Sequence, residues 1–378
     1  MRRNLRLLIL AALISIVSLS ASLPLHNTPY TETVIESRVV PITSNKVLNS
    51  LNSVENALVD LLNNPRPEGC HKAAHEIGRQ ASFSADPLKA LLLNTPEVDQ
   101  LCQYGYVHGL FQGYAVKGVS AVVIATTSCL AVPGAPGVVS ECFHASGHGV
   151  AISKTSLTDA LVECAIIYPP YDLNCAAGVY MEYMDRYWLG DAISKDAEGY
   201  APLLSEKEAL SICTGASQRL VAICAKEAPA FWGHSDNTPT FLGQRCRELA
   251  DSTTVDVIQS CGVGVGRRFQ NDAAWSLSGT SRYPETIPEA LEISRSLATS
   301  CEEATKVAGA LKFWSGCIEA AIQPTLSGQI LTKTPSSIWI DPCPAVLDKD
   351  GPYNLHPECV RIRNAIISDT DRISRNAS

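Results

Sequence analysis

The chain has 378 residues, of which 46% are hydrophobic and 18% are charged, and its formal net charge is -8. An acidic chain without a basic cluster is a poor match for nucleic acid or for an anionic membrane surface, so we expect neither partner. The length suits two domains or one extended array of repeats, and we favour the array because a similar unit recurs along the chain.

Residues 1–22 have the pattern of a secretory signal. Arg2, Arg3 and Arg6 form a basic start, a mostly apolar run of eleven residues follows, and Ser20-Ala21-Ser22 supplies small residues for cleavage. The alternative is an uncleaved segment that tethers the protein to a membrane, but the apolar run is short for a bilayer span of about 20 residues. We therefore expect a secreted or extracytoplasmic protein with no stable membrane span in the mature chain. Loss of the three arginines would change its net charge from -8 to -11.

Cysteine usage indicates the same compartment. The fourteen cysteines are an even number, all follow the signal, and no Cys-x-x-Cys occurs. This pattern is typical of structural disulfides in an oxidising compartment, rather than of a zinc ribbon or a thioredoxin-like redox site. The spacing predicts sequential pairs that each close the neck of one helical hairpin: Cys164–Cys175, Cys213–Cys224, Cys246–Cys261 and Cys301–Cys317.

Residues 23–69 read as a lead-in with one helix. Three prolines favour an extended first part, whereas apolar residues recur at helical spacing from Ser44 to Asn63. The sequence Asn63-Asn64-Pro65-Arg66-Pro67 then ends the helix.

Residues 70–190 contain two copies of a unit that bears histidines and cysteines. The first copy has Cys70-His71-x-x-x-His75-x-x-Gly78 and Cys102-x-x-Gly105-x-x-His108-Gly109. The second copy has Cys142-x-His144-x-x-x-His148-Gly149 and Cys175-x-x-Gly178-x-x-Met181. We expect helices at 70–80, at 86–93 after an Asp86-Pro87 cap, at 102–118, after Ser156, and from Cys175, with a connector and loop at 119–137.

Gly105, Gly109 and Gly113 recur every four residues in the predicted helix 102–118. On a helix they form one stripe without side chains, which lets a neighbouring backbone approach closely. The alternative is that these glycines break the segment into turns.

Residues 191–325 contain degenerate copies of the unit without a histidine pair. Ser205-x-x-Glu208 and Thr286-x-x-Glu289 are capping boxes that open helices. A loose period of roughly forty to seventy residues suits stacked helical hairpins. Residues 326–378 read as a Pro/Gly-rich loop and a C-terminal helix. The predicted fold is therefore all-α, an irregular array of disulfide-linked helical hairpin repeats that resembles an α/α solenoid.

Five of the eight histidines lie within the two copies: His71, His75, His108, His144 and His148. Residues four apart share one face of a helix, so two pairs among these five each form a bidentate clamp, and the fifth histidine lies beside the glycine stripe. Imidazole is a ligand of zinc, copper and iron, and such a site takes three or four ligands. We therefore predict that the five side chains converge and bind a transition metal, since two clamps with His108 offer more ligands than one site needs, or enough for two.

Four further side chains close to the histidines in the sequence are of types that can bind a metal. Glu76 and Glu182 are carboxylates that suit a ligand or a general base. Met181 and Met184 are soft ligands of the type that copper accepts, although buried core methionines are the commoner case.

Two functions fit these patterns. The first is a secreted metalloprotein with a histidine site, extending to a metal-dependent enzyme that activates a bound water. The second is a non-enzymatic extracellular binding solenoid that engages a protein or glycan, with histidines bonded to backbone carbonyls to fix how helices cross. The chain has no Gly-x-Ser-x-Gly elbow, no His-Glu-x-x-His and no dinucleotide fingerprint, so no catalytic residue or extracellular partner is singled out.

Overall fold

The computed structural model describes a helical protein, and residues 38–378 form one compact unit. The residues described are 50–63, 70–83, 86–95, 98, 102, 104–132, 136–154, 156–167, 169–188, 211–233, 236–278, 286–331, 336, 339–345 and 355–377. Every regular element in these ranges is a helix, which confirms the all-α prediction. The predicted signal and the capping box at 205–208 lie outside the described residues.

The α-helices, in chain order, are α2 (Leu51–Asn63), α3 (Cys70–Ala81), α4 (Pro87–Leu91), α6 (Gly105–Val116), α7 (Val119–Ser128), α8 (Pro136–Ser153), α9 (Leu157–Ile167), α10 (Asp172–Trp188), α13 (Val221–Trp232), α14 (Pro239–Ser252), α15 (Ile258–Ser278), α16 (Ile287–Ala308), α17 (Leu311–Leu331) and α18 (Leu355–Ala377). Short 3-10 helices lie at η1 (Cys129–Ala131), η2 (Pro169–Tyr171) and η4 (Cys343–Ala345). None of the described helices has both the length and the hydropathy needed to cross a bilayer.

Local sequence explains where several helices begin. Asp86 accepts a hydrogen bond from the backbone N–H of Leu88 at 3.0 Å and caps α4, as its sequence predicts. Ser156 Oγ accepts one from the N–H of Asp159 at 3.1 Å at the start of α9. The capping box predicted at Thr286 is complete in α16.

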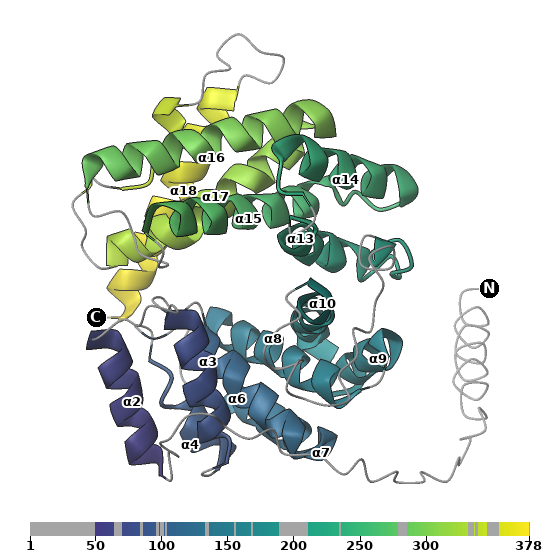
Figure 1. Ribbon diagram of the computed structural model, residues 1–378, viewed down its shortest axis with the longest axis vertical. Coiled ribbons are helices and arrows are strands. Elements are labelled where there is room, and N and C mark those ends of the chain that lie inside the picture. Colours follow the sequence, from purple (N-terminus) through teal and green to yellow (C-terminus); the bar gives the residue numbers. More distant parts are fainter. Residues whose placement is uncertain are drawn as a thin grey trace, which may run out of the picture. The chain divides into compact units, whose positions relative to one another are not determined.

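Helices from successive units pack against one another in chain order (Figure 1). Each helix contacts the next one in the series α3, α6, α8, α10, α13, α15 and α17. The helices α7, α9, α14 and α16 alternate with them along the chain, and each packs against the helix that follows it. This alternation of two helices per unit confirms the predicted array of helical hairpins.

All fourteen cysteines form disulfides. They pair consecutively along the chain, the first with the second, the third with the fourth, and so on. The four predicted bonds are confirmed. Between Cys213 and Cys224 the chain turns before α13 begins, which brings their Cα atoms to 5.5 Å. The three remaining bonds are Cys70–Cys102, Cys129–Cys142 and Cys343–Cys359.

Two segments differ from the sequence-based expectation. Residues 119–128 form the helix α7 rather than a connector, and Val122 and Ala125 on it are buried. The helix α17 continues to residue 331, into the predicted Pro/Gly-rich loop, because Leu326 and Gln329 there are also buried. In both segments tertiary packing outweighs the local signal for a loop.

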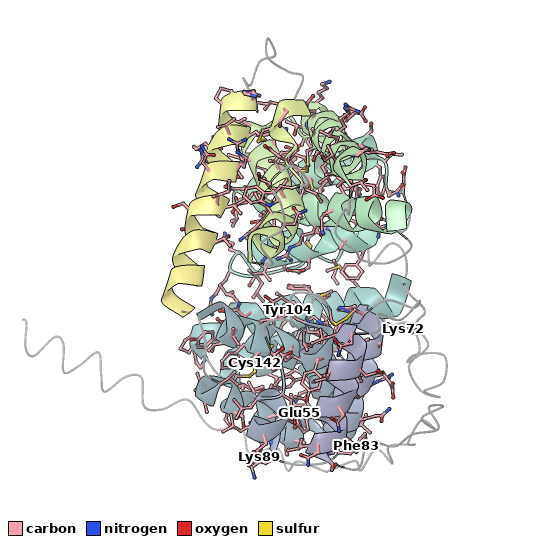
Figure 2. The ribbon with its side chains drawn as sticks, turned by 90° about the vertical axis from the view of Figure 1, so that its left-hand side faces the viewer. Glu55, Lys72, Phe83, Lys89, Tyr104 and Cys142 are labelled. Carbon is pink, nitrogen blue, oxygen red and sulfur yellow. A yellow bond between two sulfur atoms is a disulfide. The ribbon has the colours of Figure 1, made fainter. Side chains whose placement is uncertain are left out.

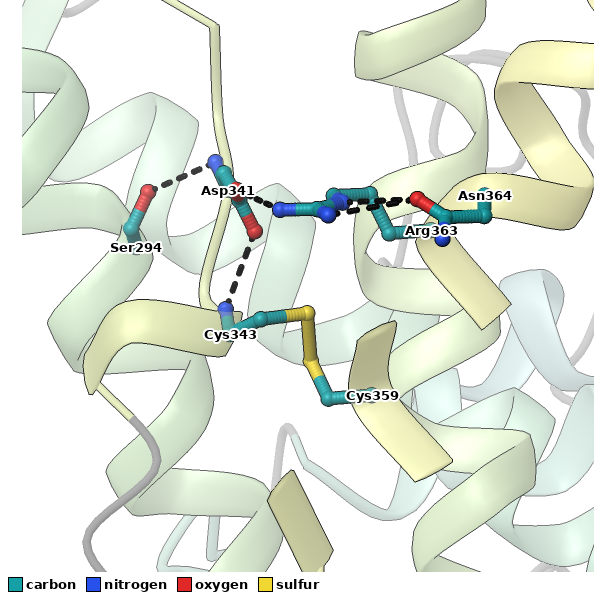
Figure 3. Close-up of a disulfide and its surroundings, with 6 residues drawn as sticks. All are labelled: Ser294, Asp341, Cys343, Cys359, Arg363 and Asn364. Carbon is teal, nitrogen blue, oxygen red and sulfur yellow. Dashed lines mark hydrogen bonds and ion pairs between the residues drawn. A yellow bond between two sulfur atoms is a disulfide. The ribbon is translucent and has the colours of Figure 1, made fainter. Parts of the chain in front are cut away.

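Asp341 ties the C-terminal helix to the array (Figure 3). Its backbone N–H donates to Ser294 Oγ of α16 at 3.0 Å, and one of its carboxylate oxygens accepts from the N–H of Cys343 at 3.1 Å. The other carboxylate oxygen lies 2.9 Å from Nη1 of Arg363 in α18. With the Cys343–Cys359 disulfide beside them, these bonds join α16, η4 and α18.

The buried apolar side chains form two clusters, one built from α2 to α10 and the other mainly from α13 to α18. Side chains fill the space between the helices, while charged residues such as Lys72 and Lys89 lie at the periphery (Figure 2). Met184 of α10 is wholly buried in the second cluster, and Met181 packs against that cluster. Both methionines therefore have the surroundings of core residues.

Candidate metal centre

The glycine stripe lets α3 and α6 meet backbone to backbone. A Cβ atom added to Gly105 or Gly109 would lie closer than 3.0 Å to the carbonyl oxygen of His71 or His75, respectively, which real Cβ atoms essentially never do. This confirms the predicted close approach, and α6 is a continuous helix rather than a series of turns. Because the contacting positions advance in the same direction along both helices, α3 and α6 run parallel.

The helices α8 and α10 meet in the same way. A Cβ atom added to Gly147 would clash with the carbonyl oxygen of Cys175, and one added to Gly178 would clash with that of His144. The duplication seen in the sequence is therefore also a duplication of packing, with one close helix pair in each copy.

These contacts set the register between the two copies. Gly109 approaches the carbonyl of His75 as Gly178 approaches that of His144. His144 therefore holds the position of His75, not that of His71. The two histidine pairs are therefore offset by one helical turn relative to the packing contacts.

The five predicted histidine side chains lie together, on α3, α6 and α8. The ring centroids of His71 and His75 are 4.6 Å apart and lie 5.9 and 5.5 Å from that of His108. The ring of His108 also lies 5.3 Å from that of His144 and 4.6 Å from that of His148, and these two are 5.3 Å from each other. His108 and His148 are buried, and the other three residues are of intermediate burial.

The cluster comprises two triads that share His108, namely His71/His75/His108 and His108/His144/His148. Each triad offers one nitrogen per ring, all within 4.8 Å of one another. Around a tetrahedral zinc with Zn–N bonds of about 2.0–2.1 Å, imidazole centroids lie about 5 Å apart. The ring spacing of both triads fits this geometry.

The tautomers of His71 and His75 follow from their partners. Nδ1 of His71 lies 2.9 Å from the carbonyl oxygen of Cys102, and Nδ1 of His75 lies 3.2 Å from Oε1 of Gln112. Because both oxygens only accept, each Nδ1 carries the proton and donates it. Each neutral ring then has its lone pair on Nε2, and these two Nε2 atoms are 3.0 Å apart.

Glu182 orients both the amide of Gln112 and the ring of His148. Its Oε2 accepts from Nε2 of Gln112 at 3.4 Å, which turns Oε1 of that amide towards His75. The same carboxylate oxygen accepts from Nδ1 of His148 at 3.0 Å, leaving a lone pair on Nε2 of that ring. Carboxylate or carbonyl acceptors behind a histidine are the usual second layer of a metal site, because they fix the tautomer and raise ligand basicity.

His108 is held by Glu141, whose Oε1 lies 3.2 Å from its Nε2. When Nε2 donates, the lone pair of His108 is on Nδ1. Among the described residues, neither Nδ1 of His108 nor Nε2 of His148 has a hydrogen-bond partner, although both atoms are buried. An unpaired buried acceptor costs about 1–3 kcal/mol, so these nitrogens are suited to a bound cation.

Burial favours the neutral form of three rings in the cluster. It lowers the pKa of His75, where the neighbouring His71 adds repulsion, and the pKa of His108, where His148 does the same. Burial also lowers the pKa of His144. Burial alone would raise the pKa of Glu141, but His144 and the hydrogen bond from His108 outweigh it and bring that pKa to about 2. Near pH 7 these rings are thus in the neutral form that binds metals, with an ionised carboxylate behind them.

Sequence reasoning missed Gln112 and Glu141. Gln112 follows His108 by four residues and Glu141 precedes His144 by three, so helical spacing would have placed each on a histidine-bearing face. Glu76, which the sequence suggests as a ligand or base, instead bonds to Arg79 and Gln80 on its own helix. His26 and His234 lie outside the described residues, and His356 lies on α18.

The donor set is one that zinc, copper and iron accept. It consists of neutral imidazoles that converge from three helices, with oxygen acceptors behind four of the rings. The geometry of this cluster is the basis for a functional assignment. The chain matches no protein-family model, no curated protein and no solved structure.

Proposed function

We propose that this protein binds a transition metal, zinc, copper or iron, at the cluster of His71, His75, His108, His144 and His148. The main support is the pair of Nε2 atoms on His71 and His75. They lie 3.0 Å apart, while each ring donates its Nδ1 proton to a fixed oxygen. Two lone pairs at this separation repel each other, and a cation bound by both removes that repulsion.

A structural role for the histidines is the competing function, within an extracellular binding solenoid. That role requires the protein itself to satisfy the buried ring nitrogens. Nδ1 of His108 and Nε2 of His148 have no such partner among the described residues. This observation favours metal binding over a purely structural cluster.

We also propose that the protein is secreted or otherwise works outside the cytoplasm. Its seven disulfides use all fourteen cysteines. Structural disulfides persist in oxidising compartments, whereas cytosolic thiols are kept reduced. The apolar, Arg-bearing start of the sequence supports the same location.

Metal content and melting temperature of two proteins test the metal proposal. The wild type, purified without chelator, should contain zinc, copper or iron, or take up one of them when offered. The double variant His75→Ala with His148→Ala should lose the metal, while its disulfides keep the fold. The control is His356→Ala, which removes a histidine from α18 and should leave metal content unchanged. A wild type that contains no metal and takes up none when all three are offered ends the proposal.

An enzyme that activates water at the metal is an extension of this function. Three protein ligands leave a coordination position open, and three of the five histidines are of intermediate burial. The protein loaded with cobalt(II) provides a test, because a small anion such as azide shifts its visible spectrum when it binds at an open position. A spectrum unchanged by azide would argue for a closed, non-catalytic site.

A further inference from the structure

We propose that the cluster holds two metal ions, one at each histidine pair, with His108 as the ligand they share. This inference rests on the proposed function, since it assumes that metal binds here. The two pairs are His71 with His75 on α3, and His144 with His148 on α8.

A single ion cannot satisfy both pairs. An ion at His71 and His75 leaves Nε2 of His148 buried and unpaired among the described residues. An ion at His144 and His148 leaves the Nε2 atoms of His71 and His75 facing each other at 3.0 Å. Each pair therefore presents ligand nitrogens of its own.

The two triads are also alike in geometry. Their nitrogens meet the same 4.8 Å limit. Their ring centroids are separated by 4.6–5.9 Å in one triad and by 4.6–5.3 Å in the other. An ion that fits one triad therefore fits the other, and ring spacing gives no reason for one triad to stay empty.

His108 is suited to serve both ions because an imidazole has two ligand atoms. Its Nδ1 has no hydrogen-bond partner among the described residues, and its Nε2 holds the proton that it donates to Glu141 at 3.2 Å. An ion binds Nδ1 without proton loss. A second ion at Nε2 takes the place of that proton, which leaves to solvent, so binding of the second ion releases one proton.

Glu182 supports both ions at once. It accepts from Nδ1 of His148 directly and, through Gln112, fixes the tautomer of His75. One carboxylate thus prepares one ligand of each pair. This arrangement suits a centre in which both pairs are occupied.

Stoichiometry decides between one ion and two. The metal-free protein is titrated with zinc, and bound zinc is measured by equilibrium dialysis with elemental analysis. We expect two equivalents for the wild type, and one for each of the variants His71→Ala/His75→Ala and His144→Ala/His148→Ala. Calorimetry in buffers of different ionisation enthalpy should show one additional proton released with the second equivalent.

Copper(II) provides a second readout that needs no variant. Two copper ions bridged by one imidazole couple magnetically, so the paramagnetic resonance signal of the wild type should weaken as the second equivalent binds. One zinc equivalent in the wild type, with an unperturbed single-copper signal, overturns the two-ion centre but leaves the proposed function intact. No binding of zinc or copper overturns both.

Discussion

The histidine-bearing helix pairs α3/α6 and α8/α10 pack in the same way as the pair α15/α17, which has no histidine at the contact. A Cβ atom added to Gly262 would clash with a carbonyl oxygen of α17, and one added to Gly316 would clash with the carbonyl of Gln259. Gln259 therefore holds the position in α15 that His75 holds in α3 and His144 in α8.

The comparison separates packing from chemistry. The same backbone contact forms with glutamine at the critical position, so an imidazole is not needed to fix how these helices cross. What the three pairs share is glycine at the points of closest approach. The histidines are therefore an addition to a packing unit that the array also uses without them, which argues against a purely structural role.

Removal of disulfides should have the largest effect on stability. It should also distinguish the two regions, the histidine-bearing region from α3 to α10 and the region from α13 to α18. Loss of Cys70–Cys102 or of Cys301–Cys317 should each lower the free energy of unfolding by about 3–4 kcal/mol. Only the first should also weaken metal binding, because His71 donates to the carbonyl of Cys102. The measurements are urea unfolding and competition with a metal chelator for the two paired Cys→Ala variants. Equal loss of metal in both would contradict a site confined to the first region.

Alanine at the close glycine contacts should have the next largest effect, and the same one in both regions. Gly78→Ala and Gly262→Ala each place a Cβ against a backbone carbonyl, at a cost of about 1–3 kcal/mol. Gly215→Ala is the matched control, because an added Cβ there meets nothing within 4 Å. It should change the free energy of unfolding by less than about 0.5 kcal/mol. A large effect for Gly78 alone would show that the two regions do not pack equivalently.

Glutamine in place of histidine should have the smallest effect on stability. His75→Gln and His144→Gln reproduce the residue found at the same position in α15. The free energy of unfolding of the metal-free protein should therefore change by less than about 1 kcal/mol. Metal affinity should fall in both variants. The check is thermal unfolding in chelator beside metal titration. A metal-free protein strongly destabilised by either change would restore the structural role of the histidines.

The features predicted from sequence are those that depend on one hairpin. The disulfide Cys164–Cys175 and the cap at Asp86 each involve residues close in the chain, so spacing and local chemistry suffice to identify them. The stripe of Gly105 and Gly109 was recognisable for the same reason, since its period is that of one helix.

The features missed depend on which helices become neighbours. Glu141 reaches His108 across the contact between α6 and α8, and Glu182 reaches Gln112 from α10. The register between the copies is open in the sequence because two histidines one turn apart allow two alignments, and the backbone contacts at Gly109 and Gly178 choose between them. The spacing within one helix can place a side chain on a histidine-bearing face, but it does not show which residue of a neighbouring helix that side chain contacts.

The pairing of every cysteine with the next one has a consequence for biosynthesis. The bonded residues are separated by only 11 to 32 positions. Short loops close at the lowest entropic cost, so the nearest thiol is also the most probable partner during oxidation. A chain that emerges amino terminus first from a translocation channel can complete each bond before the next cysteine arrives. We therefore expect vectorial oxidation in order along the chain, with little need for a disulfide isomerase to correct mispaired thiols.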